Sequence, residues 1–175
     1  MHLGGASLNC INFVVPMNPC FCGYYPDMNK CTCTPQQVRQ YQSHISQPFL
    51  DRIDICVEAG GVEYDELHST GEEETSEEIR KRVCAARKRQ YDRYGKSLTN
   101  AEIGLDELEK YCVLGMEEHG FMKQIFDRLS LTARTYHKVV KVARTIADLS
   151  GEEHIRISHL KEAVGYRTME KRKGK

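Results

Sequence analysis

Four cysteines in two close pairs constrain this chain more than any other feature. One residue separates Cys20 from Cys22, and one residue separates Cys31 from Cys33, with a turn-rich loop between the pairs. Such a loop has too few apolar residues to form a core of its own, so a metal could order it. Four thiolates are the number that a closed structural zinc site takes. The two pairs therefore predict a structural zinc site.

Other uses of these cysteines stay open at this point. A gap of one residue is tighter than the usual gap of two to four residues in zinc sites, which makes the geometry more strained. Free or redox-active thiols and an iron–sulfur cluster are the alternatives. The remaining cysteines lie singly within apolar or helical patterns, which predicts small buried hydrophobic residues at Cys10, Cys56, Cys84 and Cys112.

The composition is that of a soluble globular protein. Of the 175 residues, 40% are hydrophobic and 29% are charged, enough for one ordinary domain or two small ones. No apolar run approaches the roughly 20 residues that cross a bilayer, and the first residues lack the features of a secretory signal. We therefore expect a cytoplasmic protein with no membrane partner, in which clustered thiols favour metal over disulfides.

The first third of the chain carries α/β signals. The apolar run over 8–16 and the alternating pattern over 53–57 both predict strands. Between them, Thr34 and Pro35 predict the start of a helix that ends before Pro48.

The rest of the chain has helical patterns. Thr75 and Glu78 form a capping box that opens a long helix, and Ser158 is expected to cap the last one. Further helices are predicted over 105–112, 117–129, 132–149 and 160–166. The predicted organisation is an α/β piece over 1–68, a linker over 69–76, a helical bundle over 77–167 and a basic tail over 168–175.

A cationic flank lies on the long helix. Its members are Arg80, Lys81, Arg82, Arg87, Lys88, Arg89 and Arg93. Such a run is usually a solvated face, and the formal net charge of +0 provides no overall attraction to nucleic acid. A local contact with phosphates stays open, with Arg87 and Arg89 as the candidate nucleic-acid-binding residues.

Two polar residues near the cysteines are candidates for nucleotide chemistry. Arg52 suits contact with a phosphate, although local sequence alone favours a salt bridge to Asp51 or Asp54. Asn18 could orient a water or a phosphate oxygen, although Asn-Pro is also a common turn.

No phosphate-binding loop is present in the sequence. Gly95, Lys96 and Ser97 match the end of the P-loop pattern, but Gln90 stands where the first glycine belongs. The sequence also contains no HExxH or GxSxG motif, so metalloprotease and serine-hydrolase activities have no support.

Several blocks occurring together in order resemble one family. They are PMNPCFCGYY over 16–25, CTCTPQQVRQY over 31–41, PFLDRID over 48–54 and KVARTIADLS over 141–150. These blocks resemble the magnesium-chelatase-like AAA+ ATPases of the ComM/YifB group, and the likeness runs from about residue 13 to Arg167. It implies an α/β fragment of an AAA+ core followed by an all-α helical lid, mostly α overall.

The resemblance assigns roles to three residues. Asn18 matches sensor 1, which aligns the attacking water, and Arg52 matches the arginine finger, which reaches the nucleotide of a neighbouring subunit. Arg134, in LTARTYH over 131–137, looks like sensor 2, and Arg144 is a weaker candidate because its apolar neighbours predict a packing position. The cofactors implied for the full-length protein are ATP and Mg²⁺, and the implied partners are neighbouring subunits of a homo-oligomeric ring and DNA.

The chain also departs from the family pattern. The Walker A lysine and Walker B carboxylates lie upstream in family members, and the first dozen residues lack the expected Phe-Pro-Ala-Arg-Phe type of segment. Because phosphoryl transfer depends on the phosphate cradle and the metal, we expect no ATPase activity from this chain alone.

The resemblance implies DNA remodelling, with branch migration as the role in the group. Chelatase-type metal insertion, a zinc-stabilised nucleic-acid-binding module and a helical half that serves only oligomerisation are the alternatives.

Overall fold

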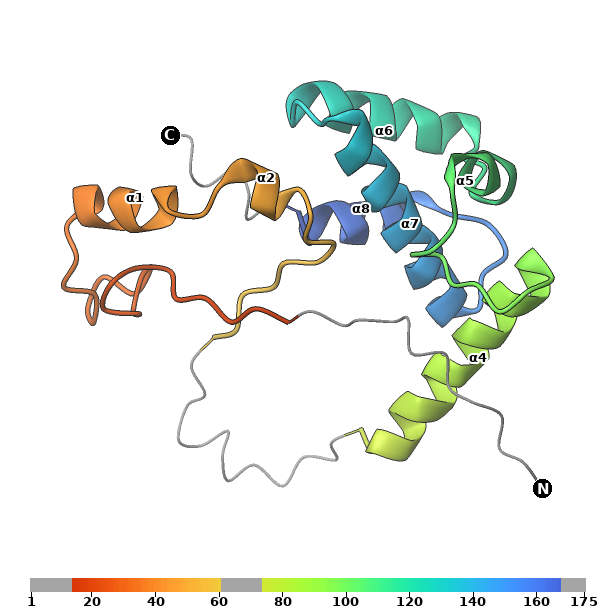
Figure 1. The fold of residues 1–175 in the computed structure, drawn as a ribbon, viewed down its shortest axis with the longest axis horizontal. Helices are drawn as coiled ribbons and strands as arrows, with labels where there is room; N and C mark the ends of the chain where they lie inside the picture. The colour runs from red at the N-terminus through yellow and green to blue at the C-terminus, as the bar shows by residue number, and fades with distance from the viewer. Residues whose placement is uncertain (1–13, 61–73, 168–175) are drawn as a thin grey trace. The chain divides into compact units, whose positions relative to one another are not determined.

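The computed structural model describes residues 14–60 and 74–167 and divides the chain into two compact units. The cysteine unit ends at Ser46, and the helical unit begins at Gln47. The described residues contain helices and no strand (Figure 1). None of their helices is both long enough and apolar enough to cross a membrane.

The cysteine unit consists of a turn-rich loop followed by helix α1 (Pro35–Ser43). The predicted cap is confirmed, because the Thr34 hydroxyl accepts from the Gln37 N–H while the Gln37 side chain accepts from the Thr34 N–H. The loop packs on α1 through an edge-to-face contact of Phe21 with Tyr41, 4.9 Å between ring centroids. Among the described residues of this unit only Cys20 and Val38 are buried hydrophobic residues, so its apolar core is minimal.

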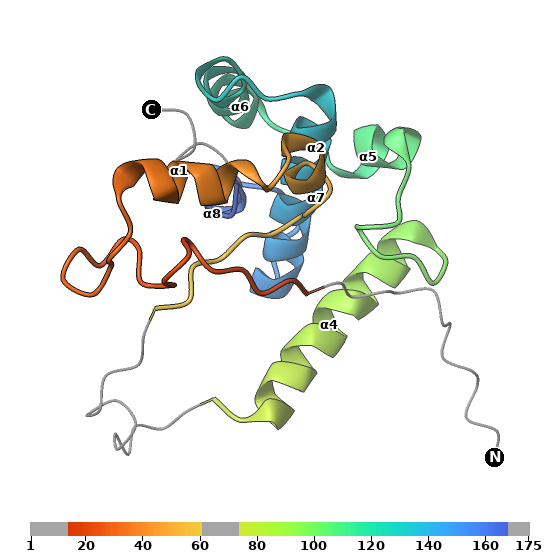
Figure 2. The ribbon, with the colours of Figure 1, turned by 60° about the vertical axis from the view of Figure 1, so that its left-hand side comes forward.

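The helical unit contains the remaining helices. They are α2 (Gln47–Leu50), α4 (Ser76–Tyr94), α5 (Leu105–Tyr111), α6 (Met116–Arg128), α7 (Ala133–Ser150) and α8 (Ile157–Gly165). Helix α7 packs against both α4 and α8, and its C-terminal end reaches α4 in both views (Figures 1 and 2). The capping box of Thr75 and Glu78 is confirmed at the start of α4, and Gly151 ends α7 in the left-handed conformation, with φ of 78°.

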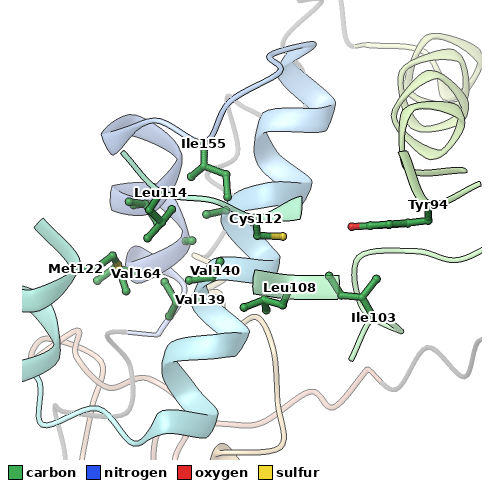
Figure 3. Packing of buried hydrophobic residues seen from close by; sticks show 13 residues of the cluster. Tyr94, Ile103, Leu108, Cys112, Leu114, Met122, Val139, Val140, Ile155 and Val164 are labelled. Atoms are coloured by element: carbon green, nitrogen blue, oxygen red, sulfur yellow. The ribbon is translucent and has the colours of Figure 1, made fainter. Parts of the chain in front are cut away.

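The apolar core of the helical unit surrounds α7. This helix buries Val139, Val140 and Ala143, which pack with Met122 of α6 and Leu160 of α8 in one cluster (Figure 3). The spacing of three and four residues along α7 explains why one face of the helix is buried.

A buried polar network joins α4 to the end of α7. The Asp148 side chain has no exposed surface and accepts from Arg93 through both carboxylate oxygens, one at 3.0 Å. Asn100 Nδ2 donates to the same carboxylate at 2.8 Å, and Arg144 Nη2 lies 3.1 Å from it. Arg144 is itself buried and donates to the carbonyls of Glu152 and Glu153, so its predicted packing position is confirmed.

The two predicted strands are not found as strands in the described residues. The segment over 53–57 has no regular structure, and the run over 8–16 lies mostly outside the described residues, with 14–16 also irregular. A strand requires a partner ladder, and here the Cys56 N–H donates to the Tyr166 carbonyl at 3.0 Å instead. The α/β part of the predicted fold class is therefore not seen, whereas the mostly α part is confirmed.

Smaller predictions are corrected by the structure. Cys84 is exposed because it lies on the solvent side of α4, whereas Cys112 is buried as predicted and Cys56 is half-buried. Cys10 lies outside the described residues, as do 69–73 of the predicted linker and the basic tail.

The predicted cap of the last helix differs from the structure. Ser158 does not cap α8, because the helix already begins at Ile157 and the N–H of Arg156, the residue before it, donates to Nδ1 of His159. The predicted end of the first helix before Pro48 is confirmed, because α1 ends at Ser43. Pro48 lies inside the separate short helix α2, where proline is tolerated because the first turn needs no N–H from it.

Candidate functional site

The four cysteines predicted to bind metal converge on one point of the cysteine unit. The sulfur atoms of Cys20, Cys22, Cys31 and Cys33 all lie within 4.8 Å of one another. The sulfur of Cys22 lies 3.3 Å from that of Cys20 and 3.6 Å from that of Cys31. Cys20 is fully buried and the other three are half-buried.

The sulfur positions fit a tetrahedral metal. Four sulfurs bonded to zinc at about 2.3 Å lie about 3.8 Å apart, and the observed separations bracket this value. The tight gap of one residue within each pair is therefore compatible with the geometry. No other group of three or more potential metal-binding side chains occurs in the described part of the chain.

Backbone N–H groups directed at the sulfurs favour thiolates at the first pair. The N–H groups of Tyr24 and Thr32 help lower the pKa of Cys22 to about 5. Burial and the Cys22 side chain oppose ionisation of Cys20, but hydrogen bonds from the N–H groups of Tyr25 and Gly23, together with Cys33, leave its pKa lowered. Such N–H···S bonds orient thiolate ligands around a metal.

In the second pair, Cys31 and Cys33, the pKa values are raised. The N–H of Cys33 favours the Cys31 thiolate, but burial and the neighbouring Cys22 and Cys20 outweigh it and raise the pKa of Cys31 to about 11. The pKa of Cys33 is raised for similar reasons. Four sulfurs this close cannot all ionise easily without a compensating cation, so the cluster has the electrostatics of a metal site.

Gly23 makes the loop possible. Its φ of +84° lies in the left-handed region, which allows the chain to turn back so that the Gly23 N–H reaches the Cys20 carbonyl at 3.2 Å. A Cβ at this position would lie 3.9 Å from Cγ of Asn18, so backbone conformation and not crowding requires the glycine.

Asn18, the predicted sensor 1, is exposed in the cysteine unit, two residues before Cys20. It lies in an open groove of about 650 Å³ between the loop and α1, together with Met17, Phe21, Tyr41 and His44. The Asn18 amide is therefore accessible.

Arg52, the predicted arginine finger, is exposed in the helical unit directly after α2. Its Nη1 donates to the Pro48 carbonyl at 2.6 Å, so the side chain folds back over its own turn. Asp54, one of the two predicted salt-bridge partners, instead pairs with Lys138 at 2.7 Å.

The main chain beside Arg52 is held by cations from the helical bundle. Lys138 Nζ donates to the Arg52 carbonyl at 2.7 Å, and Arg167 Nη1 donates to the Ile53 carbonyl. Sequence reasoning missed both residues because nothing in the local sequence pairs them with a segment about a hundred residues away. The periodicity of α7 would place Lys138 beside the buried face, but it does not identify the acceptor.

Arg134, the predicted sensor 2, is the second residue of α7 and is exposed. The Thr132 hydroxyl accepts from the Thr135 N–H at 3.1 Å and caps the helix. A cation at a helix N-terminus is unfavourable unless an anion lies nearby, so the position suits a phosphate contact better than a stabilising role.

Arg87 and Arg89, the candidate nucleic-acid-binding residues, have different environments. Arg89 Nη1 donates to the Asp148 carbonyl at 3.0 Å, so it helps hold the end of α7. Arg87 is exposed. Several other members of the cationic flank are paired with acidic residues in Lys81–Glu77, Arg82–Glu74 and Lys88–Asp92.

The structure thus brings the four cysteines together and leaves Asn18, Arg52 and Arg134 exposed on different elements. Asn18 belongs to the cysteine unit, and the two arginines belong to the helical unit.

Comparison with known families matches nearly the whole chain. Residues 73–167 match the family described as magnesium chelatase, subunit ChlI C-terminal, and residues 8–67 match magnesium chelatase, subunit ChlI. The boundary between the two matches falls within residues 68–72, close to the predicted linker.

Individual relatives cover the same region. The competence protein ComM of Haemophilus influenzae is 40% identical over 157 residues, which is 89% of this chain and 30% of that protein. The uncharacterized proteins YifB of Salmonella typhimurium and Escherichia coli are 38% and 36% identical, over 90% of this chain and 31% of each relative. The chain thus spans about a third of the length of the curated relatives it matches.

Proposed function

Because this chain belongs to the magnesium chelatase subunit ChlI family, we propose that it forms the sensor and lid portion of a ring-forming AAA+ ATPase. In this role Arg52 acts on the nucleotide of a neighbouring subunit, Asn18 aligns the attacking water, and Arg134 links the nucleotide to the lid. The whole protein uses ATP and Mg²⁺ and works in the cytoplasm.

The observation that carries this proposal is the setting of Arg52. Its guanidinium is exposed, while the carbonyls of Arg52 and Ile53 are held by cations of the helical bundle. An arginine that only formed a local salt bridge to Asp54 would not leave that carboxylate to Lys138. A held main chain with an exposed guanidinium suits a residue that reaches a phosphate outside its own unit once its bond to the Pro48 carbonyl is broken.

We propose DNA remodelling as the work that the ATPase drives. The relative from Haemophilus is named a competence protein, which supports this choice over metal insertion. A stand-alone nucleic-acid-binding module has less support, because Arg89 is engaged with α7 and several other cations of the flank are paired.

A structural zinc bound by Cys20, Cys22, Cys31 and Cys33 is part of the proposal. The metal would neutralise the thiolates and order a loop whose unit has almost no apolar core. It would thereby fix the backbone next to Asn18.

ATP turnover tests the proposal. The chain contains no P-loop, so the purified chain should not hydrolyse ATP. A chimera of the Haemophilus relative, in which residues 8–167 of this chain replace the matched segment, should hydrolyse it. The Arg52→Ala chimera should lose about 10³-fold or more in rate, as removal of an arginine finger does.

Two results would contradict the proposal. One is ATP hydrolysis by the isolated chain. The other is an Arg52→Ala chimera that hydrolyses ATP as fast as the unsubstituted chimera. Arg128→Ala, a change at another arginine of the bundle, is the control and should leave the rate of ATP hydrolysis unchanged.

A further inference from the structure

One face of α7 carries both a proposed nucleotide contact and the anchor of the Arg52 segment. Arg134 and Lys138 are four residues apart in α7, so they lie one above the other on the same side of the helix. Arg134 is exposed, whereas the Lys138 side chain is only 17% exposed and points its ammonium at the Arg52 segment.

Lys138 makes two short contacts with this segment. Its Nζ donates to the Arg52 carbonyl at 2.7 Å and pairs with Asp54 Oδ1 at 2.7 Å, so one ammonium spans the residues on both sides of Ile53. Bonds from an ammonium to a carbonyl and a carboxylate are charge-assisted, and they are stronger where the donor is shielded from water.

The end of the helical bundle provides a second anchor. The buried Arg167 donates to the Ile53 carbonyl, and the Tyr166 carbonyl accepts from the Cys56 N–H at 3.0 Å. All these bonds engage the main chain or Asp54, whereas the Arg52 guanidinium donates to the Pro48 carbonyl at 2.6 Å. Breaking that one exposed hydrogen bond lets the side chain reach outward while its Cα stays in place.

Lys138 is also fixed at its base. The next two residues, Val139 and Val140, are buried in the core, so a shift of α7 displaces the Lys138 ammonium and with it the Arg52 carbonyl.

We infer that Lys138 is a positioning residue that couples the Arg134 end of α7 to the Arg52 segment, so that lid position sets the reach of the finger. The inference rests on the proposed function of Arg52. If a nucleotide contact at Arg134 shifts α7, the Arg52 main chain shifts with the helix, because Arg134 and Lys138 lie on the same helix face and Lys138 holds the Arg52 carbonyl.

Hydrogen exchange of the full 175-residue chain tests the anchor without any ATP chemistry. Lys138→Met keeps the aliphatic stem and removes the ammonium. It should raise exchange of the Cys56 and Ile53 amides by about tenfold, the effect of losing one charge-assisted hydrogen bond. Lys138→Arg should restore most of the protection.

Lys141→Met is the matched control. Lys141 lies on the same helix and donates to the carbonyls of Ala101 and Ile103 at 3.2 and 2.6 Å. Its replacement should loosen the segment near Ile103 and leave Cys56 protected. Equal exchange of the Cys56 amide in the Lys138→Met and parent chains would show that Lys138 does not anchor the segment. If Lys138→Met does not fold, Asp54→Asn weakens the same ion pair while keeping the Lys138 ammonium, and the comparison is made with that variant.

ATP turnover in the chimera tests the coupling. Lys138→Met should lower kcat about tenfold or more with less than a twofold change in KM for ATP, because it misplaces the finger and leaves nucleotide binding intact. Lys138→Arg should recover part of kcat, and Lys141→Met should leave both constants unchanged.

The outcomes separate this inference from the proposed function. If Arg52→Ala lowers kcat and Lys138→Met does not, the positioning role is wrong and the finger assignment stands. If Arg52→Ala has no effect, the finger assignment fails together with the coupling, whereas the hydrogen-exchange result still decides whether Lys138 anchors the segment.

Discussion

Four arginines of the helical unit carry the same charge in very different surroundings. Arg144 is buried, and Arg93 donates to the fully buried Asp148, where burial alone would lower the pKa of both guanidiniums. Asp148 opposes this effect and prevails at Arg93, whose pKa is raised, so its charge is retained. Arg52 and Arg134 are exposed instead. Exposure thus separates the two arginines of the buried Asp148 network from the two proposed to contact a nucleotide.

Loss of the buried carboxylate should destabilise the helical unit. Asp148→Ala leaves two arginines facing each other without an anion, so the free energy of unfolding should fall by about 3–5 kcal/mol in urea titrations. Asp92→Ala removes a carboxylate whose side chain is 65% exposed and paired with Lys88, and it should change stability by less than about 0.5 kcal/mol. Similar effects for both variants would mean that the Asp148 network contributes little.

The cysteine cluster and Lys138 differ in how far the sequence predicts them. The cysteine spacing alone predicts that Cys20, Cys22, Cys31 and Cys33 form a cluster, because neighbours in a short loop must lie close. The role of Lys138 could not be predicted, since its acceptor at Arg52 is 86 residues away in sequence. Long-range partners depend on tertiary packing that no local pattern encodes.

At the scale of elements, the sequence predicts the helices better than the strands. The helix start at Thr34 and the capping box at Thr75 lie where the sequence predicts them, because each satisfies specific backbone groups. The 53–57 segment alternates like a strand, yet hydrogen bonds to the bundle replace the ladder. Alternation alone therefore does not make a strand, which also needs a neighbour, and here Ile55 and Val57 remain exposed.

The cap of α4 should respond to acid. Backbone and side-chain hydrogen bonds from Thr75 hold the pKa of Glu78 below its ordinary value of 4.5. Because the folded-state pKa is lowered, the cap is at full strength above about pH 4.5 and is lost as the pH falls through the folded-state pKa. Amide chemical shifts of the first turn of α4 should follow this titration.

Thr75→Val is the control for the α4 cap. It removes the hydroxyl but keeps the backbone N–H, so the Glu78 pKa should move part of the way back toward 4.5. An unchanged pKa in this variant would show that the hydroxyl bond has no effect on the carboxylate.

The cysteine loop should require its metal. The purified chain should contain one zinc per molecule, and a strong chelator should expose the loop and α1 to proteolysis while the helical unit keeps its melting temperature. Cys22→Ser should abolish the bound zinc. Cys84→Ser, at an exposed cysteine outside the cluster, should retain the bound zinc. A metal-free chain whose cysteine loop resists proteolysis would contradict the zinc site.

At the scale of the whole molecule, the residues proposed as sensors and finger share one property, exposure to solvent. Asn18, Arg52 and Arg134 are all exposed, and the chain spans about a third of its curated relatives. The family and the mostly helical fold followed from sequence blocks, whereas the division at Ser46 did not, because it depends on contacts between distant residues.

Mixing two inactive subunits tests this account most directly. Chimeras with Arg52→Ala are combined with chimeras whose P-loop lysine, in the segment from the Haemophilus relative, is replaced. If Arg52 acts on the neighbour's nucleotide, mixed rings contain complete sites and ATP hydrolysis returns, although each variant alone is inactive. If the mixture stays as inactive as its components, Arg52 does not act across a subunit interface, and the central claim is wrong.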